Sequence, residues 1–171
     1  MFDRFNGLPM HPLIVHAAVV LVPLLALGAI VYAVVPGLRR HFRIVVGLLA
    51  IAAPAAVGAA VLSGNTFSKN KNLQAPQQQA TITTHHNFGI NTLWFSIGLG
   101  VAALLLVFLV VPAYRRRSYR GNDDTLPAPS RSTPVVLQVV LGVIVIGLAG
   151  VTLYYVFKTG DSGAHMVFNG Y

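Results

Sequence analysis

Histidine is the residue type in this chain with the clearest capacity for ligand or acid–base chemistry. Five of its six histidines are predicted to lie on the same side of the molecule: His11 and His16 near the N-terminus, His85 and His86 in mid-chain, and His165 near the C-terminus. His41 is predicted to lie on the opposite side. A neutral imidazole is a good ligand for haem iron, copper or zinc. Cysteine is absent, so disulfides, thiolate catalysis and cysteine-ligated metal centres are excluded.

Other catalytic equipment is missing. The chain has four acidic residues, all aspartates, and none lies in a long apolar segment. Paired carboxylates, a Ser/His/Asp set and a phosphate-binding glycine loop are therefore absent. The sequence favours a protein without independent enzymatic activity.

Four long apolar segments must position the histidines: residues 12–35, 44–62, 88–111 and 134–157. Each is close to the roughly 20 residues that a helix needs to cross a bilayer. Hydrophobic residues make up 55% of the 171-residue chain and charged residues 9%, against about 25% charged in soluble proteins. The segments lack the alternation of barrel strands. We predict an all-α fold, an integral membrane four-helix transmembrane bundle that forms a single domain over residues 1–171.

The cations predict the orientation of the bundle. Eight of the twelve lie between the first and second segments or in the basic loop 112–133, and four lie on the other side. Cytoplasmic loops are enriched in Lys and Arg, so both termini and the loop 63–87 are predicted to be extracytoplasmic. We expect a multi-pass protein of the bacterial cytoplasmic (inner) membrane. The net charge of +8 then reflects orientation and lipid contact, and we expect the bilayer, not nucleic acid, as partner.

One histidine lies inside a predicted span. An ionisable group within a span is a functional-site hypothesis by default, and the partner for His16 at similar depth is His86 or His85. Two facing imidazoles would form a haem b site, with His16 and His86 as axial ligands and His11 and His85 as supporting or alternative ligands. The leading hypothesis is therefore a b-type haem-binding or redox-associated membrane subunit.

Other functions stay open. Interfacial histidines can instead hydrogen-bond headgroups, carbonyls or water in a non-catalytic scaffold or accessory subunit. A copper or zinc site, or a transport component, would use His16, His86 and His165 at the outer face. A pH-sensing or proton-relay role is a further alternative.

The segment Ser63-Gly64-Asn65 is predicted to close the second helix, whichever of these functions applies. No internal repeat is evident beyond histidines at the start of the first and third helices.

The N-terminal motif carries a family resemblance. Gly7-Leu8-Pro9-Met10-His11-Pro12-Leu13-Ile14-Val15-His16 is similar to the Gly-x-Pro-x-His-Pro-x-x-Val-His opening of a bacterial four-helix membrane family, catalogued as domain of unknown function 2231. Histidines at the third helix and a glycine-rich tail after the fourth fit the same family, although Asn169 stands where we expect histidine. The resemblance implies this topology and a redox setting, because related domains appear beside electron-transfer modules. Partners would then be electron-transfer proteins or other membrane subunits.

Overall fold

The computed structural model describes residues 4–5, 8–70, 76–110 and 134–168. Its long helices are α1 (Met10–Val34), α2 (Arg39–Asn70), α3 (Pro76–Leu109) and α4 (Val135–Phe168). The short 3₁₀ helix η1 (Pro36–Leu38) joins α1 to α2, as expected where Pro36-Gly37 ends a helix. Two short strands, β1 (Arg4–Phe5) and β2 (Leu8–Pro9), pair antiparallel before α1. All four long helices are long and apolar enough to cross a membrane, which confirms the all-α transmembrane bundle.

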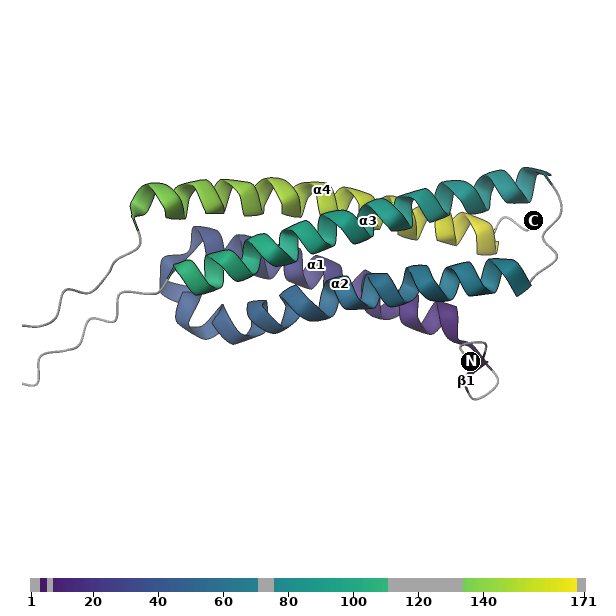
Figure 1. The fold of residues 1–171 in the computed structure, drawn as a ribbon, viewed down its shortest axis with the longest axis horizontal. Coiled ribbons are helices and arrows are strands. Elements are labelled where there is room, and N and C mark those ends of the chain that lie inside the picture. Colours follow the sequence, from purple (N-terminus) through teal and green to yellow (C-terminus); the bar gives the residue numbers. More distant parts are fainter. Residues whose placement is uncertain (1–3, 6–7, 71–75, 111–133, 169–171) are drawn as a thin grey trace, which may run out of the picture.

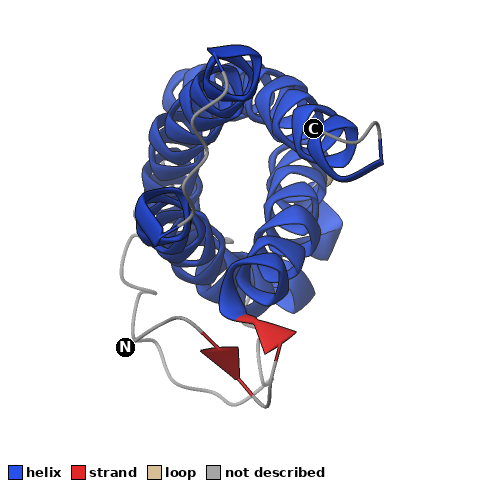
Figure 2. Cartoon of the chain, turned by 90° about the vertical axis from the view of Figure 1, so that its right-hand side faces the viewer, coloured by secondary structure: helices blue, strands red, loops and turns tan. Residues whose placement is uncertain are grey.

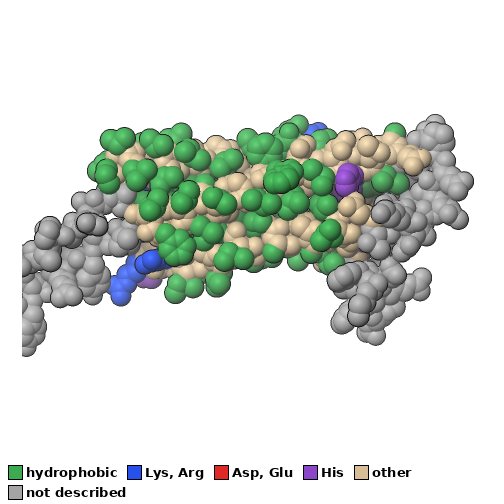
Figure 3. All heavy atoms as spheres, in the orientation of Figure 1, with side chains coloured by type: hydrophobic (Ala, Val, Ile, Leu, Met, Phe, Trp, Pro, Cys, Tyr) green, Lys and Arg blue, Asp and Glu red, His purple; other side chains and the backbone are tan. Residues whose placement is uncertain are grey.

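The outer flanks of the bundle are apolar, as a bilayer requires. Large hydrophobic side chains such as Ile44, Phe108 and Val136 are exposed on the helices, and Figure 3 shows such side chains over the visible flank. In water this surface would be strongly unfavourable, because each Å² of exposed apolar area costs about 25 cal/mol. In hydrocarbon it costs nothing.

The helices are longer than the predicted spans. The second continues to Asn70 and the third begins at Pro76, so most of the predicted loop 63–87 is helical. The fourth continues from the predicted end at 157 to Phe168. Hydropathy marks only the part of a helix that lies in hydrocarbon, and polar residues continue these helices beyond it. The hydroxyls of Thr83 and Thr84, for example, donate to carbonyls one turn back.

The bundle has two chemically distinct ends (Figure 1). The histidine end holds the start of α1, the end of α2, the start of α3 and the end of α4, and therefore His11, His16, His85, His86 and His165. The arginine end holds the end of α1 and the start of α2, with Arg39, Arg40, His41 and Arg43. The basic loop 112–133 and Asn169 lie outside the described residues. Which end faces the cytoplasm stays a prediction.

The four helices form a closed ring (Figure 2) in which α1 contacts α2 and α4, and α3 contacts α2 and α4. Neighbouring helices are antiparallel, as expected for connections of short or moderate length. The core between them contains mostly alanine, valine and leucine, with Leu25, Leu99 and Val145 fully buried.

The two halves of the ring repeat one pattern of buried residues. When His11 is aligned with His85, the buried residues of α1 fall on buried residues of α3. These pairs are Ala18/Thr92, Val22/Ser96, Leu25/Leu99, Ala26/Gly100, Ala29/Ala103 and Tyr32/Leu106. When Ser63 is aligned with Ser162, the helices α2 and α4 match in the same way. Those pairs are Val46/Val145, Ala50/Ala149, Ala53/Thr152 and Val57/Val156. The α1–α2 and α3–α4 hairpins therefore share one pattern of buried positions and read as two copies of one unit.

Candidate functional site

His11 is held by the last turns of α2. Its Nδ1 lies 2.9 Å from Ser63 Oγ, and Ser63 Oγ donates to the carbonyl of Ala60 at 2.9 Å. Because the single hydroxyl proton of Ser63 is used on that carbonyl, Ser63 Oγ accepts from His11 Nδ1–H. A neutral imidazole carries one N–H, so the lone pair of His11 is assigned to Nε2.

His85 has the same arrangement in the other hairpin. Its Nδ1 lies 2.9 Å from Ser162 Oγ, and Ser162 Oγ donates to the carbonyl of Thr159 at 3.0 Å. The ring of His85 therefore also donates from Nδ1 and carries its lone pair on Nε2. Both rings thus have the orientation that a fixed Nδ1–H partner gives to metal-binding histidines.

A glycine beside each serine makes room for the ring. A Cβ on Gly64 would lie 3.1 Å from His11 Cε1, and a Cβ on Gly163 would lie 3.2 Å from His85 Cε1. Both distances are shorter than ordinary carbon–carbon contacts, which begin near 3.5 Å. The prediction that Ser63-Gly64-Asn65 closes α2 is wrong, because α2 continues to Asn70. Gly64 instead lets an imidazole pack against the helix.

The two imidazoles act on each other electrostatically. His11 and His86 both lie within electrostatic range of His85, although α1 and α3 stand diagonally across the ring. Burial lowers the pKa of His11 below its ordinary value of 6.5, and the nearby carbonyl of Ala60 partly offsets this. At pH 7 His11 is therefore mostly neutral, which is the form that binds a metal.

The two histidines expected as axial ligands, His16 and His86, differ in exposure from His11 and His85. The side chains of His16 and His86 are exposed on the bundle, whereas those of His11 and His85 are half-buried. His16 is thus inside the candidate span Leu13–Val34 but at its outer surface. His11 and His85, which were expected as supporting or alternative ligands, lie within electrostatic range of each other.

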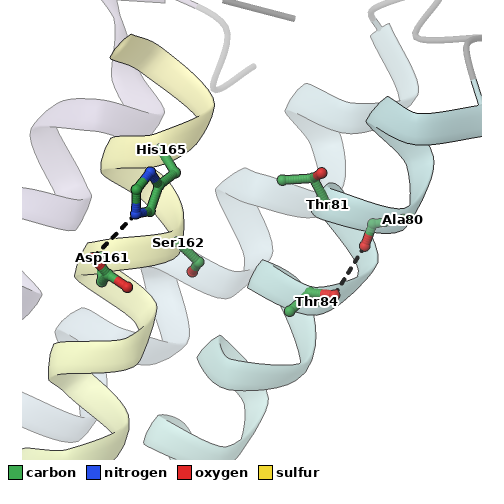
Figure 4. Close-up of a pocket in the computed structure, with 6 residues that line it drawn as sticks. All are labelled: Ala80, Thr81, Thr84, Asp161, Ser162 and His165. Carbon is green, nitrogen blue, oxygen red and sulfur yellow. Dashed lines mark hydrogen bonds and ion pairs between the residues drawn. The ribbon is translucent and has the colours of Figure 1, made fainter. Parts of the chain in front are cut away.

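His165 lies beside the second half of this site (Figure 4). Its Nε2 is 3.5 Å from an Asp161 carboxylate oxygen, one helical turn away, and both side chains are largely exposed. Together with Ser162, Thr81 and Thr84 they line a shallow hollow between α3 and α4. Within the described part of the chain, no three His, Asp or Glu side chains gather as an ion site would require.

The serines of the site are not evident from sequence alone. Ser63 and Ser162 are ordinary polar residues near helix ends. The signal that could have found them is the recurrence of Ser-Gly in two segments that each end a hairpin beginning at histidine. Thr92 reinforces the second half, since its hydroxyl lies 2.9 Å from that of Thr159 across α3 and α4.

The comparisons with known proteins agree with this architecture. A family model described as "Predicted membrane protein (DUF2231)" matches residues 7–170. A search of curated proteins found no match, and neither did a search of solved structures. The match covers both hairpins, including the His11–Ser63 and His85–Ser162 pairs, and nearly all of the chain. The chain therefore belongs to the DUF2231 family of predicted membrane proteins.

Proposed function

We propose that the histidine end of the bundle binds a b-type haem, with His11 and His85 as its axial ligands, in a membrane subunit that takes part in electron transfer. The observation that carries the proposal is the duplicated His–Ser–Gly arrangement. It sets a half-buried imidazole on each of two opposite helices, with Nδ1–H already bonded and the lone pair on Nε2. A histidine needed only to contact headgroups would not require such an arrangement in both hairpins.

The donor set favours haem over zinc. Structural zinc sites take four protein ligands, and catalytic sites take three. The described residues offer no such group, but they do offer two neutral imidazoles. Two axial imidazoles suffice for haem, because the porphyrin supplies the other four nitrogens. Copper(I) in linear coordination also needs only two such ligands, and binding of copper is one outcome of the test below.

The chain's own residues would hold and orient the group. Bound haem would supply a one-electron redox centre. Ser63 and Ser162 would fix the rotation of the two rings, and a hydrogen bond to Nδ1–H raises the basicity of the coordinating nitrogen. Gly64 and Gly163 would let both rings stay against their helices. Exposed apolar flanks would hold the subunit in the bilayer, where electron-transfer proteins or other membrane subunits would be its partners.

The absorption spectrum tests the haem proposal. We expect the full chain, produced with ample haem, to show a Soret band that shifts on reduction with dithionite. His11→Ala and His85→Ala should each abolish the shifted band or lower haem affinity by about 100-fold, because one axial bond is lost. His16→Ala and His86→Ala, which alter exposed rings, should retain it.

Each outcome identifies a different site. Loss of the band in His16→Ala and His86→Ala but not in His11→Ala would transfer the ligand role to the exposed pair. A colourless protein that binds copper or zinc through His11 and His85 would make this a metal site. A protein that takes up neither haem nor metal would contradict the proposal and leave a scaffold role.

The orientation of the bundle has an independent test. We propose that the histidine end faces outward from the bacterial cytoplasmic membrane, as the cation distribution predicts. Because the chain has no cysteine, single cysteines can be introduced without background. Thr81→Cys at the histidine end should react with a membrane-impermeant maleimide in intact cells, whereas Arg40→Cys should react only after lysis. The reverse pattern would invert the bundle.

A further inference from the structure

The arginine end holds a buried cation with neutral partners. Arg39 is only 8% exposed, although arginine is rarely buried without a counter-charge. Its Nε donates to the carbonyl of Tyr32 and its Nη2 to that of Ala33, both at 3.0 Å, and its Nη1 donates to Gln138 Oε1 at 3.0 Å. These bonds tie α2 to the last turn of α1 and to α4. None of them supplies a negative charge.

No carboxylate of the described residues balances this charge. The aspartate in the described part of the chain is Asp161, which pairs with His165 at the opposite end of the bundle. Arg43, one turn further along α2, adds a second cation, and its side chain is exposed. Both guanidinium groups act electrostatically on the Tyr32 hydroxyl. The surroundings of the Tyr32 hydroxyl are therefore positively charged.

Within the described residues, the Tyr32 hydroxyl has no hydrogen-bond partner. The residue is fully buried at 0% exposure, and among the described side chains its Oη is a buried polar atom with no hydrogen bond. Arg39 Cζ lies 5.9 Å from the centre of its ring. An unpaired buried hydroxyl is unfavourable. The Tyr32 hydroxyl is thus a buried donor within electrostatic range of two cations, Arg39 and Arg43, and an acceptor anion there would pair with it.

The second hairpin shows that closing the bundle does not require this cluster. At the repeat positions that correspond to Tyr32 and Arg39, the second hairpin has Leu106 and Gln138. Leu106 is equally buried and leaves no polar atom unpaired. The cluster is therefore a specialised feature of the first hairpin.

We propose that Tyr32, Arg39 and Arg43 form a binding site for a phosphate group at the arginine end of the bundle. Guanidinium groups bind phosphate oxygens through paired, charge-assisted hydrogen bonds, and a tyrosine hydroxyl adds a third donor. Arg43 gives access from outside the bundle, while Tyr32 and Arg39 form the inner wall. The phosphate belongs either to an anionic phospholipid or to free inorganic phosphate. Basic pockets between transmembrane helices commonly bind the head groups of anionic phospholipids.

The test uses the purified, delipidated full chain in detergent. Thermal unfolding and native mass spectrometry would be recorded with phosphatidylglycerol, with zwitterionic phosphatidylcholine and with inorganic phosphate. We expect phosphatidylglycerol to raise the unfolding temperature and phosphatidylcholine to have little effect. Tyr32→Phe and Arg43→Gln should each weaken the anion response by about tenfold, as expected when one hydrogen bond to a charged group is lost. These two variants avoid Arg39, whose substitution would also break contacts between helices.

The controls separate a site from diffuse charge. Arg40→Gln removes the same charge from an exposed neighbour and should leave the response unchanged. Tyr32→Phe should leave the stability of the anion-free protein equal or higher, because it removes an unpaired hydroxyl. Competition by inorganic phosphate would identify the free anion as the ligand, and its absence would identify the lipid. Equal losses in Arg40→Gln and Arg43→Gln, or no response to either phosphate source, would overturn the proposal whether or not haem binds at the other end.

Discussion

Gly100→Ala is expected to destabilise the bundle by at least about 3 kcal/mol or to prevent folding. A Cβ at position 100 would lie 2.5 Å from the carbonyl oxygen of Ala50 on α2 and 3.3 Å from Pro54 Cγ. The distance to the Ala50 oxygen is much shorter than a van der Waals contact, and this oxygen belongs to the backbone of α2. A side chain can rotate away from a new methyl group, but a helix backbone can move only if α2 and α3 separate.

The cause of this close approach is Pro54. Proline has no N–H, so the carbonyl of Ala50 loses its usual donor one turn later in α2. We infer that this missing bond makes room for α3, which carries glycine where it approaches Ala50 and Pro54. The corresponding positions of the other half are Ala26 and Leu153, where no proline interrupts the helix and alanine is accommodated.

Unfolding of the purified protein in detergent would measure the effect. Gly147→Ala on α4 is the matched control, because a Cβ there meets nothing within 4 Å. Alanine has the higher helix propensity, so this control should be neutral or slightly stabilising. Adding Pro54→Ala to Gly100→Ala should recover part of the loss, since it restores a donor to Ala50. A Gly100→Ala protein as stable as Gly147→Ala would show that the helices are not in such close contact.

The membrane architecture could be predicted because a few strong signals determine it. Uncharged segments of about 20 residues have to be helices in a bilayer, and short connections make neighbours antiparallel. The helix ends were less predictable. Hydropathy falls at the membrane surface, but α2 and α3 continue through polar residues such as Asn65 and Gln79, which are compatible with a helix in water.

The candidate site was only partly predictable for a related reason. Histidine is conspicuous in an apolar chain, so its gathering at one end could be read from the sequence. Which rings face inward depends on helix rotation, and the sequence favoured His16 because of its depth. The structure instead directs His11 and His85 inward, because Gly64 and Gly163 leave space for them. A glycine that accommodates a ring looks the same in sequence as a glycine that ends a helix.

The duplication was hidden for a physical reason as well. Bilayer-facing and core positions both favour apolar residues, so the two hairpins can diverge while keeping the same buried positions. Leu25/Leu99 and Ala29/Ala103 are identical, but Tyr32/Leu106 and Arg39/Gln138 are not. These two differences place the buried tyrosine and the buried arginine in the first hairpin, at the arginine end. The His–Ser–Gly arrangement at the histidine end is thus the same in both hairpins, whereas the cluster at the arginine end is not.

Acid is expected to release a ligand held by His11 and His85, and to do so only below the pH at which ordinary histidines become charged. Coordination needs the Nε2 lone pair, so protonation competes with binding. Burial lowers the pKa of His11 below 6.5, and the ring therefore stays neutral to lower pH than it would in water. A proton on either ring also repels one on the other, because the two lie within electrostatic range.

The lowered pKa of His11 also determines how the stability of the folded protein depends on pH. Below pH 6.5 the unfolded chain protonates His11 before the folded one does, so the unfolded state binds more protons and stability falls with pH. The contribution of His11 is complete above about pH 6.5 and is lost as pH falls through its lower folded value. Soret absorbance and unfolding temperature recorded from about pH 8 to about pH 4 should therefore fall together. Release of the ligand with a midpoint above about pH 6.5 would contradict its coordination by buried, neutral His11 and His85. His16→Ala should leave the profile unchanged, whereas a profile that moved with His16→Ala would assign the titration to the exposed ring.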